Sequence, residues 1–304
     1  MAGFDVTSNY SGKAAGFYVN SALKEATSLD FITMIENIKY RSNIQKYSNA
    51  GLITAAGCDF VSAGDLTGTE AILAPTNLMV NLDLCKAELL DSFEALSMRA
   101  GAGAPPPASF DDYVISYMGE IIADGVEGMI WQGAGTAASF NGFSTTTTGV
   151  LAANADVVDV ATVGGAGSAI NVGNVIENFQ NTVAAIPSAV YPKEDLYLYV
   201  SPKTWRLYIQ AVSALTSFPY ASMNEDYTKV FEGIKLAVCP GQANDTIVAA
   251  QKSNLFFGTD LISDTTRIQL MDMAQLDGSD NMRLVARFSG GVQTAIGGDV
   301  VFTS

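Results

Sequence analysis

The stretch LYLYVSPKTWRLYI, residues 196–209, predicts a strand followed at once by a capped helix. Residues 196–200 are aliphatic and aromatic, which favours a strand. Ser201 then stands at the N-cap position. Pro202 occupies the first helical position, where a missing N–H leaves no hydrogen bond unmade. The face that this helix would bury is formed by Trp205, Tyr208, Ile209 and Val212.

The same strand and helix pattern occurs once before this stretch. Val157 to Val163 has strand character, the glycine-rich run GGAGSA follows it, and Asn171 can cap a helix. Apolar residues recur at helical spacing after that cap, at Val172, Ile176, Phe179, Val183 and Ile186. Strand, helix, strand, helix predicts one α/β domain over residues 155–240.

The last third of the chain and the segment before residue 155 have a different character. Short strands separated by Gly and Asp turns are predicted at 233–238, 246–250, 267–273, 282–288 and 298–302, which indicates a mostly antiparallel sheet. Upstream, GAGAPPPA at 101–108 cannot continue a helix, but Ser109 with Asp112 resembles a capping box. A long amphipathic helix is therefore predicted over 109–131.

The first 86 residues combine an arm, a helix and a hairpin. Residues 1–20 show no clean period and predict an arm, whereas apolar spacing over 23–38 predicts an amphipathic helix. Residues 48–77 are rich in Gly, Ala and Thr, and strict alternation over 78–85 predicts a strand. Together, residues 48–86 predict a long hairpin that leaves and re-enters the body.

Composition excludes several classes of function. The 304 residues carry a net charge of -15, which disfavours sequence-specific DNA binding and binding to anionic membranes. The absence of histidine removes Ser-His-Asp and Cys-His catalysis and the commonest zinc sites. Three widely spaced cysteines fit reduced thiols. With no signal peptide and no long apolar run, a soluble cytosolic product is expected.

The motifs that suggest a cofactor or metal are incomplete. Gly165 and Gly167 begin a dinucleotide fingerprint, but its sixth position is Ile170. The calcium-like run from Asp277 lacks the glycine at position six and the glutamate at position twelve, so a hairpin turn is the better interpretation. Paired acids such as Asp111 and Asp112 fit a helix start or turns. We therefore expect no cofactor, no metal and no enzymatic activity.

The order of these elements resembles that of tailed-bacteriophage major capsid proteins, the Hong Kong 97 type fold. Three stretches carry the resemblance: GMIWQGAGTAASFNGF at 128–143, LYLYVSPKTWRLYI at 196–209 and NLFFGTDLISDTTRIQLMD at 254–272. The resemblance implies an α+β fold with an N-terminal arm, an extended loop, a spine helix, an apical α/β domain and a peripheral antiparallel sheet. The corresponding segments are 1–47 for the arm and helix, 48–86 for the extended loop, 87–154 for the spine helix and first peripheral part, 155–240 for the apical domain, and 241–304 for the returning peripheral sheet.

The implied function is self-assembly, as hexamers and pentamers, into the icosahedral shell that encloses a phage genome. The expected location is the virion capsid, with assembly in the host cytoplasm. Expected partners are portal, scaffolding or cement proteins, with only weak, non-specific contact to packaged DNA and no membrane. An encapsulin-type compartment and a carboxylate-dependent enzyme remain alternatives. The residues expected at subunit interfaces are Phe17, Tyr18, Leu52, Phe60, Leu66, Ile72 and Leu73.

Three further expectations concern particular residues. Some members of the family join subunits through an extended-loop lysine, but residues 47–85 here contain neither Lys nor Arg, and Lys46 and Lys86 are expected at the hairpin base. Covalent cross-links are therefore not expected. Deleting residues 52–77 should leave a folded body that does not assemble. Trp205→Ala should destabilise the apical domain by about 3 to 5 kcal/mol.

Overall fold

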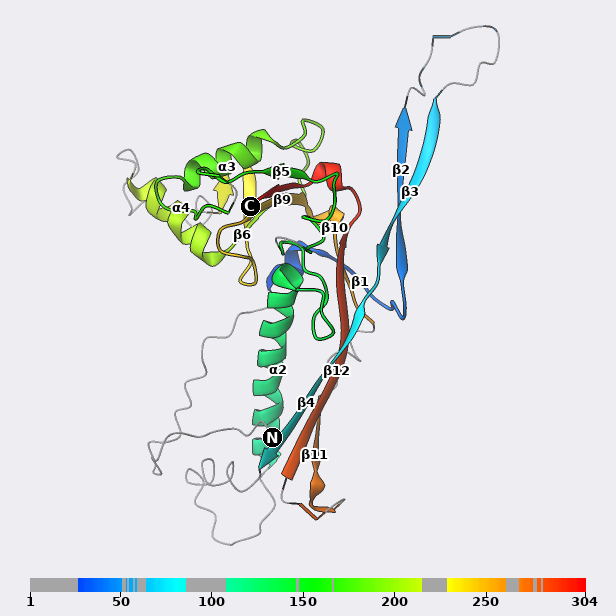
Figure 1. The fold of residues 1–304 in the computed structure, drawn as a ribbon, viewed down its shortest axis with the longest axis vertical. Helices are drawn as coiled ribbons and strands as arrows, with labels where there is room; N and C mark the ends of the chain where they lie inside the picture. The colour runs from blue at the N-terminus through cyan, green and yellow to red at the C-terminus, as the bar shows by residue number, and fades with distance from the viewer. Residues whose placement is uncertain are drawn as a thin grey trace.

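The structure is a computed structural model of the 304-residue chain. It describes residues 27–50, 53, 55–56, 58, 64–85, 108–145, 148–165, 167–214, 229–260, 268–275, 278–279 and 281–304. A long helix and a long sheet run side by side, an α/β domain stands at one end of them, and a two-stranded hairpin projects past that domain (Figure 1). The predicted arm at residues 1–20 lies outside the described residues.

The α/β domain is built on a six-stranded sheet in the order β5-β13-β9-β6-β8-β7. Its strands β6 and β8 are parallel, as are β5 and β13, whereas β9 runs antiparallel to both of its neighbours. In chain order the strands are β5 (Val158–Val160), β6 (Leu196–Val200), β7 (Val230–Phe231), β8 (Ile234–Val238), β9 (Ile247–Gln251) and β13 (Val301–Thr303).

Helices α3 (Val175–Ala184) and α4 (Pro202–Ala214) cover one face of this sheet. The strand, cap and helix predicted at residues 196–209 are confirmed. The Thr204 N–H donates to Ser201 Oγ at 3.2 Å, as an N-cap requires. Helix α3 begins later than predicted. Asn171 and Asn174 instead stabilise a turn, in which the Asn171 N–H donates to Asn174 Oδ1 at 2.7 Å.

The long helix α2 (Ala108–Gln132) confirms the spine helix predicted at 109–131. It lies along a five-stranded sheet with a β1-β10-β12-β11 path, in which β4 also pairs with β12. Met118 of α2 packs against Leu84, Met282 and Leu284 of that sheet. The strands are β1 (Thr33–Ile35), β4 (Thr76–Cys85), β10 (Leu255–Gly258), β11 (Ile268–Asp272) and β12 (Asn281–Thr294). We call this the peripheral sheet.

Short elements complete the described chain. The 3-10 turns are η1 (Thr27–Phe31), η3 (Lys252–Asn254), η4 (Met273–Gln275) and η5 (Gly297–Asp299), and the hairpin strands are β2 (Ser42–Ala50) and β3 (Asp65–Leu73). The amphipathic helix predicted over 23–38 is wrong from residue 27 onward. Residues 33–35 instead pair in parallel with β10, because a tertiary strand partner overrides a weak local helical period.

The sheets divide the chain differently from the predicted segments. Strands β9 and β13 belong to the six-stranded sheet, so residues 241–304 contribute to both sheets. Strand β4 pairs with β12 over ten residues, so the hairpin spans 42–73 and does not extend to residue 86. Pairing between residues far apart in the sequence, such as Ala249 with Val301 and Cys85 with Asn281, decides both boundaries, and local patterns carry no signal for it.

One aromatic cluster joins the two parts of the molecule. Trp131, near the end of α2, is fully buried, with its ring centroid 5.4 Å from Tyr199 of β6 and 5.5 Å from Phe143. The face of the six-stranded sheet opposite α3 and α4 therefore packs directly on the spine helix. This contact fixes the apical domain on the end of α2 and leaves the hairpin as the projecting element.

Candidate assembly surface

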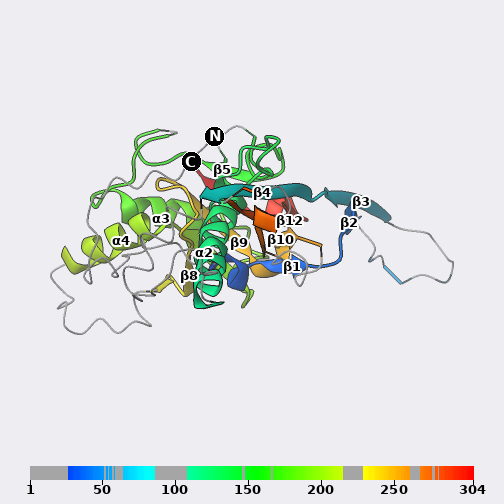
Figure 2. The same ribbon diagram turned by 90° about the horizontal axis from the view of Figure 1, so that it is seen from below.

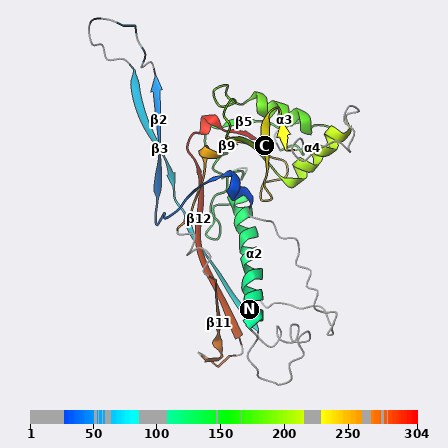
Figure 3. The same ribbon diagram turned by 180° about the vertical axis from the view of Figure 1, so that it is seen from behind.

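Strands β2 and β3 form an antiparallel ribbon with nine register pairs. Among the described residues the ribbon pairs with no third strand, and it rises beside the apical domain (Figures 1 and 3). An isolated two-stranded hairpin is at best marginally stable in water, because it buries little apolar surface. Within the described part of the chain, most of the ribbon therefore lacks a stabilising contact.

The register separates the ribbon into two faces, because residues directly opposite each other in an antiparallel pair share a face. We call the face that no described element covers the outer face. Three large apolar residues on it are exposed: Tyr47 by 65%, Leu66 by 67% and Ile72 by 43%. Its other described members are Asn43, Gln45, Gly68 and Glu70.

Local contacts organise the outer face in the isolated chain. The Tyr47 ring lies across Gly68, where an added Cβ would meet Tyr47 Cε1 at 3.4 Å. Glycine opposite an aromatic ring is a known way to hold a strand pair in register. The Tyr47 hydroxyl also donates to Gln45 Oε1 at 2.8 Å, and Asn43 Nδ2 donates to Glu70 Oε2 at 2.8 Å. These side chains are therefore partly ordered in the free subunit, which reduces the conformational entropy that they lose when a partner binds.

The base of the ribbon is fastened to the body. Leu73 is only 1% exposed, and it crowds Gly258 of β10 together with Ile38. Gln293 Nε2 of β12 donates to the Ile72 carbonyl at 2.9 Å. Beyond this anchor, a cavity of about 650 Å³ separates the inner face, at Lys46 and Thr69, from the body.

The predicted interface residues fall into three groups. Leu66 and Ile72 lie exposed on the outer face, whereas Leu73 lies beneath the surface of its own chain and offers nothing to a neighbour. Phe17, Tyr18, Leu52 and Phe60 lie outside the described residues. Tyr47 is not among the predicted residues, because the predicted hairpin begins at residue 48. The sequence carries no signal for this residue, because its pairing with Gly68 and its exposure depend on the register of the ribbon.

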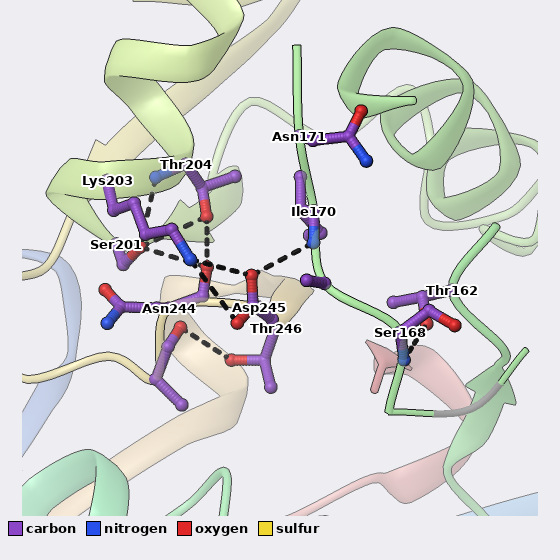
Figure 4. A network of polar contacts seen from close by, with 12 residues as sticks. Thr162, Ser168, Ile170, Asn171, Ser201, Lys203, Thr204, Asn244, Asp245 and Thr246 are labelled. Atoms are coloured by element: carbon purple, nitrogen blue, oxygen red, sulfur yellow. Dashed lines mark hydrogen bonds and ion pairs between the residues drawn. The ribbon is translucent and has the colours of Figure 1, made fainter. Parts of the chain in front are cut away.

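A network of polar contacts joins three loops of the apical domain (Figure 4). Asp245 accepts a hydrogen bond from the Ile170 N–H at 3.0 Å and pairs with Lys203 Nζ at 3.2 Å. Thr204 Oγ1 donates to the Asn244 carbonyl at 2.6 Å. The glycine-rich turn that resembles a phosphate loop is thus held by a carboxylate of the chain itself. This arrangement agrees with a structural role for the turn.

We also searched the described residues for metal-binding groups and membrane-spanning helices. No group of three or more His, Cys, Asp or Glu among them is arranged to hold a metal ion. No described helix is long and apolar enough to cross a membrane. The exposed apolar outer face is therefore the surface of the described chain that most needs a functional explanation.

Solved structures resemble the chain over almost its whole length. The capsid of a native GTA particle matches with a TM-score of 0.66 and 11% identity, over 94% of this chain and 92% of that one. The capsid of Myoviridae phage XM1 matches with a TM-score of 0.62 and 11% identity, over 100% and 99%. Mycobacterium phage Che8 matches with a TM-score of 0.54 and 13% identity, over 94% and 93%.

The chain has the Hong Kong 97 type capsid fold. No protein-family model matches the sequence, and no curated protein matches it either. At 10 to 13% identity the likeness lies in the order and packing of elements. In this fold, α2 is the spine helix, the six-stranded sheet with α3 and α4 is the apical domain, and the β2–β3 ribbon is the extended loop. The predicted fold class is confirmed.

Proposed function

We propose that the chain is the major capsid protein of a tailed phage, which assembles with copies of itself into the icosahedral shell around the genome. The outer face of the extended loop carries this proposal. A ribbon without a core of its own exposes Tyr47, Leu66 and Ile72 beyond the body that anchors it. Buried against another subunit, these side chains would contribute the apolar centre of an interface.

The structural neighbours support the same function. They include capsids of GTA particles and of phages, and the two GTA capsids were computed with C5 symmetry, which a closed shell contains at its fivefold vertices. We infer hexamers and pentamers as the building units. Leu66 and Ile72 are the proposed interface residues among the described ones, with Tyr47 added, and Phe17, Tyr18, Leu52 and Phe60 stay proposed.

The rest of the proposal follows from this role. The subunit would carry no catalytic step, and it would be found in the virion after assembly in the host cytoplasm. Portal, scaffolding or cement proteins would bind the assembled form. One of the solved structures, a satellite phage P4 procapsid, includes a size determination protein, so accessory proteins occur with this fold. We propose the segments of the chain as the sheets define them, with the extended loop at 42–73.

Electron microscopy of the purified chain tests the proposal directly. Closed shells are expected, and nucleic acid inside them when they are isolated from infected cells. A protein cargo inside would instead favour an encapsulin-type compartment. A chain that stays monomeric under all assembly conditions would contradict both.

Two substitutions test the outer face itself. Leu66→Glu should leave the subunit folded and reduce shell yield at least about tenfold, since an unpaired charge at an apolar contact costs well over 1.4 kcal/mol. Thr69→Glu is the control, because it adds the same charge on the inner face, opposite Lys46 in the register. Equal shell yields from the two variants would show that the outer face is not an interface.

A further inference from the structure

The hairpin between β7 and β8 contains an unfavourable backbone conformation. Phe231 pairs with Ile234, so Glu232 and Gly233 form a two-residue turn. Their φ angles are 46° and 84°, and a type I′ turn requires a positive φ at both positions. Gly233 adopts this conformation freely, but a residue with a Cβ does so against steric repulsion.

Glutamate is an unfavourable residue for the first position of such a turn. Asn and Asp are preferred there, because their short polar side chains tolerate the left-handed region. Among the described residues only one other non-glycine residue, Asn37, has a positive φ, and it belongs to the preferred class. Glu232 is therefore the described residue whose backbone conformation its own side chain does not explain.

The surrounding chain holds this turn in place. Phe231 is buried, and its ring centroid lies 5.2 Å from that of Phe179 and 5.8 Å from that of Tyr208. The Tyr191 hydroxyl donates to the Glu232 carbonyl at 3.0 Å. Strain persists only where neighbouring contacts fix the backbone in this way. The exposed side chain of Glu232 therefore projects from a rigid turn.

The surface around the turn has the composition of an interface. Three large apolar side chains are exposed in the described part of the apical domain, Val172, Tyr191 and Val230, and the last two adjoin the turn. Glu232 forms no ion pair with another described residue. A charge on a fixed backbone beside exposed apolar groups gives a contact both its register and its preferred partner.

A second copy of the chain carries the complementary charge. The exposed cations in the described part of the apical domain are Lys193, Arg206, Lys229 and Lys235. None of them forms an ion pair with another described residue. In a ring of copies, one surface of each copy meets a different surface of the next, so a carboxylate and a cation from separate places on one domain can pair. The pentamers and hexamers proposed above are such rings.

We propose that Glu232 is an interface residue of the apical domain, and that its carboxylate pairs with a cation of the neighbouring copy in the assembled ring. This inference rests on the proposed function, and it adds a contact separate from the extended loop. Figure 2 shows β8, the second strand of this hairpin, at the end of the molecule that carries α3 and α4, away from the β2–β3 ribbon. The free subunit carries the strain at position 232, and the assembled ring gains the ion pair.

Two substitutions separate the strain from the charge. Glu232→Asn removes the carboxylate and gives the turn its preferred Asn-Gly sequence, so the unassembled subunit should melt about 2 to 4 °C higher. Its shell yield should nevertheless fall at least about tenfold, because the same contact is lost at every position of each ring. Glu232→Gln also removes the charge but keeps a long side chain in the strained conformation. It should lose the same shell yield without any rise in melting temperature.

Charge reversal gives the third comparison. Glu232→Lys places a like charge against the neighbour's cation and should lower shell yield further than Glu232→Gln. Calorimetry measures the melting temperature of each unassembled variant, and light scattering with electron microscopy measures shell yield. Equal melting temperatures for the Asn and Gln variants, or a Lys variant that assembles better than the Gln variant, would overturn the inference.

Shell formation by the unsubstituted chain separates the two levels of failure. If the unsubstituted chain forms no shells, the proposed function itself fails. If it forms shells and the three variants form them equally well, the capsid role stands and the role of Glu232 falls.

Discussion

Glu127 of the spine helix shows how single residues hold the junction of the molecule together. Its side chain is fully buried, and it accepts hydrogen bonds from Ser28 Oγ at 2.5 Å and from the Gly241 N–H at 3.2 Å. The indole N–H of Trp131 donates to the same Ser28 hydroxyl at 2.6 Å. A buried carboxylate is costly unless donors surround it, so these contacts tie residues 27–31, α2 and the loop after β8 into one unit.

Cys239 lies in the same environment, and its thiol should be inert. Burial raises the pKa of Cys239 well above the usual range of a thiol, and the negative charge of Glu127 raises it further. The reactive thiolate is therefore scarce at neutral pH. We expect iodoacetamide to modify Cys58 and Cys85 in the native unassembled subunit and to leave Cys239 intact until denaturant is added. Modification of all three at similar rates, read by peptide mass spectrometry, would contradict this.

Phe179 should matter more to the apical core than Trp205. Phe179 is fully buried between Phe231 and Tyr208, at centroid distances of 5.2 and 5.4 Å, whereas Trp205 lies only partly buried at the edge of the same cluster. Phe179→Ala should therefore lower the free energy of unfolding by about 3 to 5 kcal/mol. Trp205→Ala should cost less than the sequence alone suggests.

Urea denaturation of both variants, followed by circular dichroism, gives the comparison. Trp205 is half-buried because it lies at the margin of the buried face of α4. Helical spacing alone does not distinguish the centre of a buried face from its margin. A larger loss for Trp205→Ala than for Phe179→Ala would mean that the apical core is centred on α4 and not on α3.

At the scale of elements, the sequence predicts what local chemistry decides. The cap at Ser201 and the start of α2 after Pro107 follow from residues within a few positions of each other, and both agree with the structure. The pairing of β1 with β10 joins residue 33 to residue 256, and β13 enters the apical sheet beside β9. No local period encodes such pairings, so the sheet memberships could not be predicted.

The residues of the candidate assembly surface also divide into those that local sequence predicts and those that it does not. Leu66 and Ile72 were identifiable as apolar residues in a ribbon without its own core. Leu73 alternates to the opposite face, where it packs with Ile38 against Gly258. Because a strand has a period of two, an error of one residue moves a side chain from the interface to the core.

The register also shows which residues a deletion must keep if it is to test the extended loop alone. Removing residues 52–77 would take Leu73 out of the core and Thr76 out of its pairing with Gly290. Replacing residues 44–71 by Asn-Gly keeps both, and it joins Asn43 to Ile72, which already face each other. We expect this variant to keep the thermal transition of the body within a few degrees and to form no shells.

Calorimetry and light scattering on the shortened chain measure the two properties separately. Leu66→Glu provides the matched full-length comparison, since it should show the same loss of assembly with the ribbon present. Loss of the cooperative transition in the shortened chain would place the ribbon within the folding core and remove the reason for treating it as an assembly element.

At the scale of the whole molecule, the proposed function raises the question of what would hold a shell of such subunits together. Lys46 lies five residues into the ribbon opposite Thr69, farther out than the hairpin base where the sequence placed it. It is half-buried and lines the cavity between the inner face and its own body. Residues 47–85 contain no Lys or Arg, so the outer face presents no amine to a neighbour.

Mature shells should therefore lack covalent cross-links made by the extended loop. An amide bond to a neighbouring subunit needs a lysine that reaches it in a desolvated setting, and Lys46 instead lines the cavity between the ribbon and its own body. Apolar burial of Tyr47, Leu66 and Ile72 would hold the subunits together, and detergent disrupts such contacts. Boiling purified particles in reducing detergent should release monomer only. A ladder of covalent oligomers would contradict the prediction, and its loss in a Lys46→Arg variant would identify Lys46 as the source, because arginine keeps the charge but cannot form the amide.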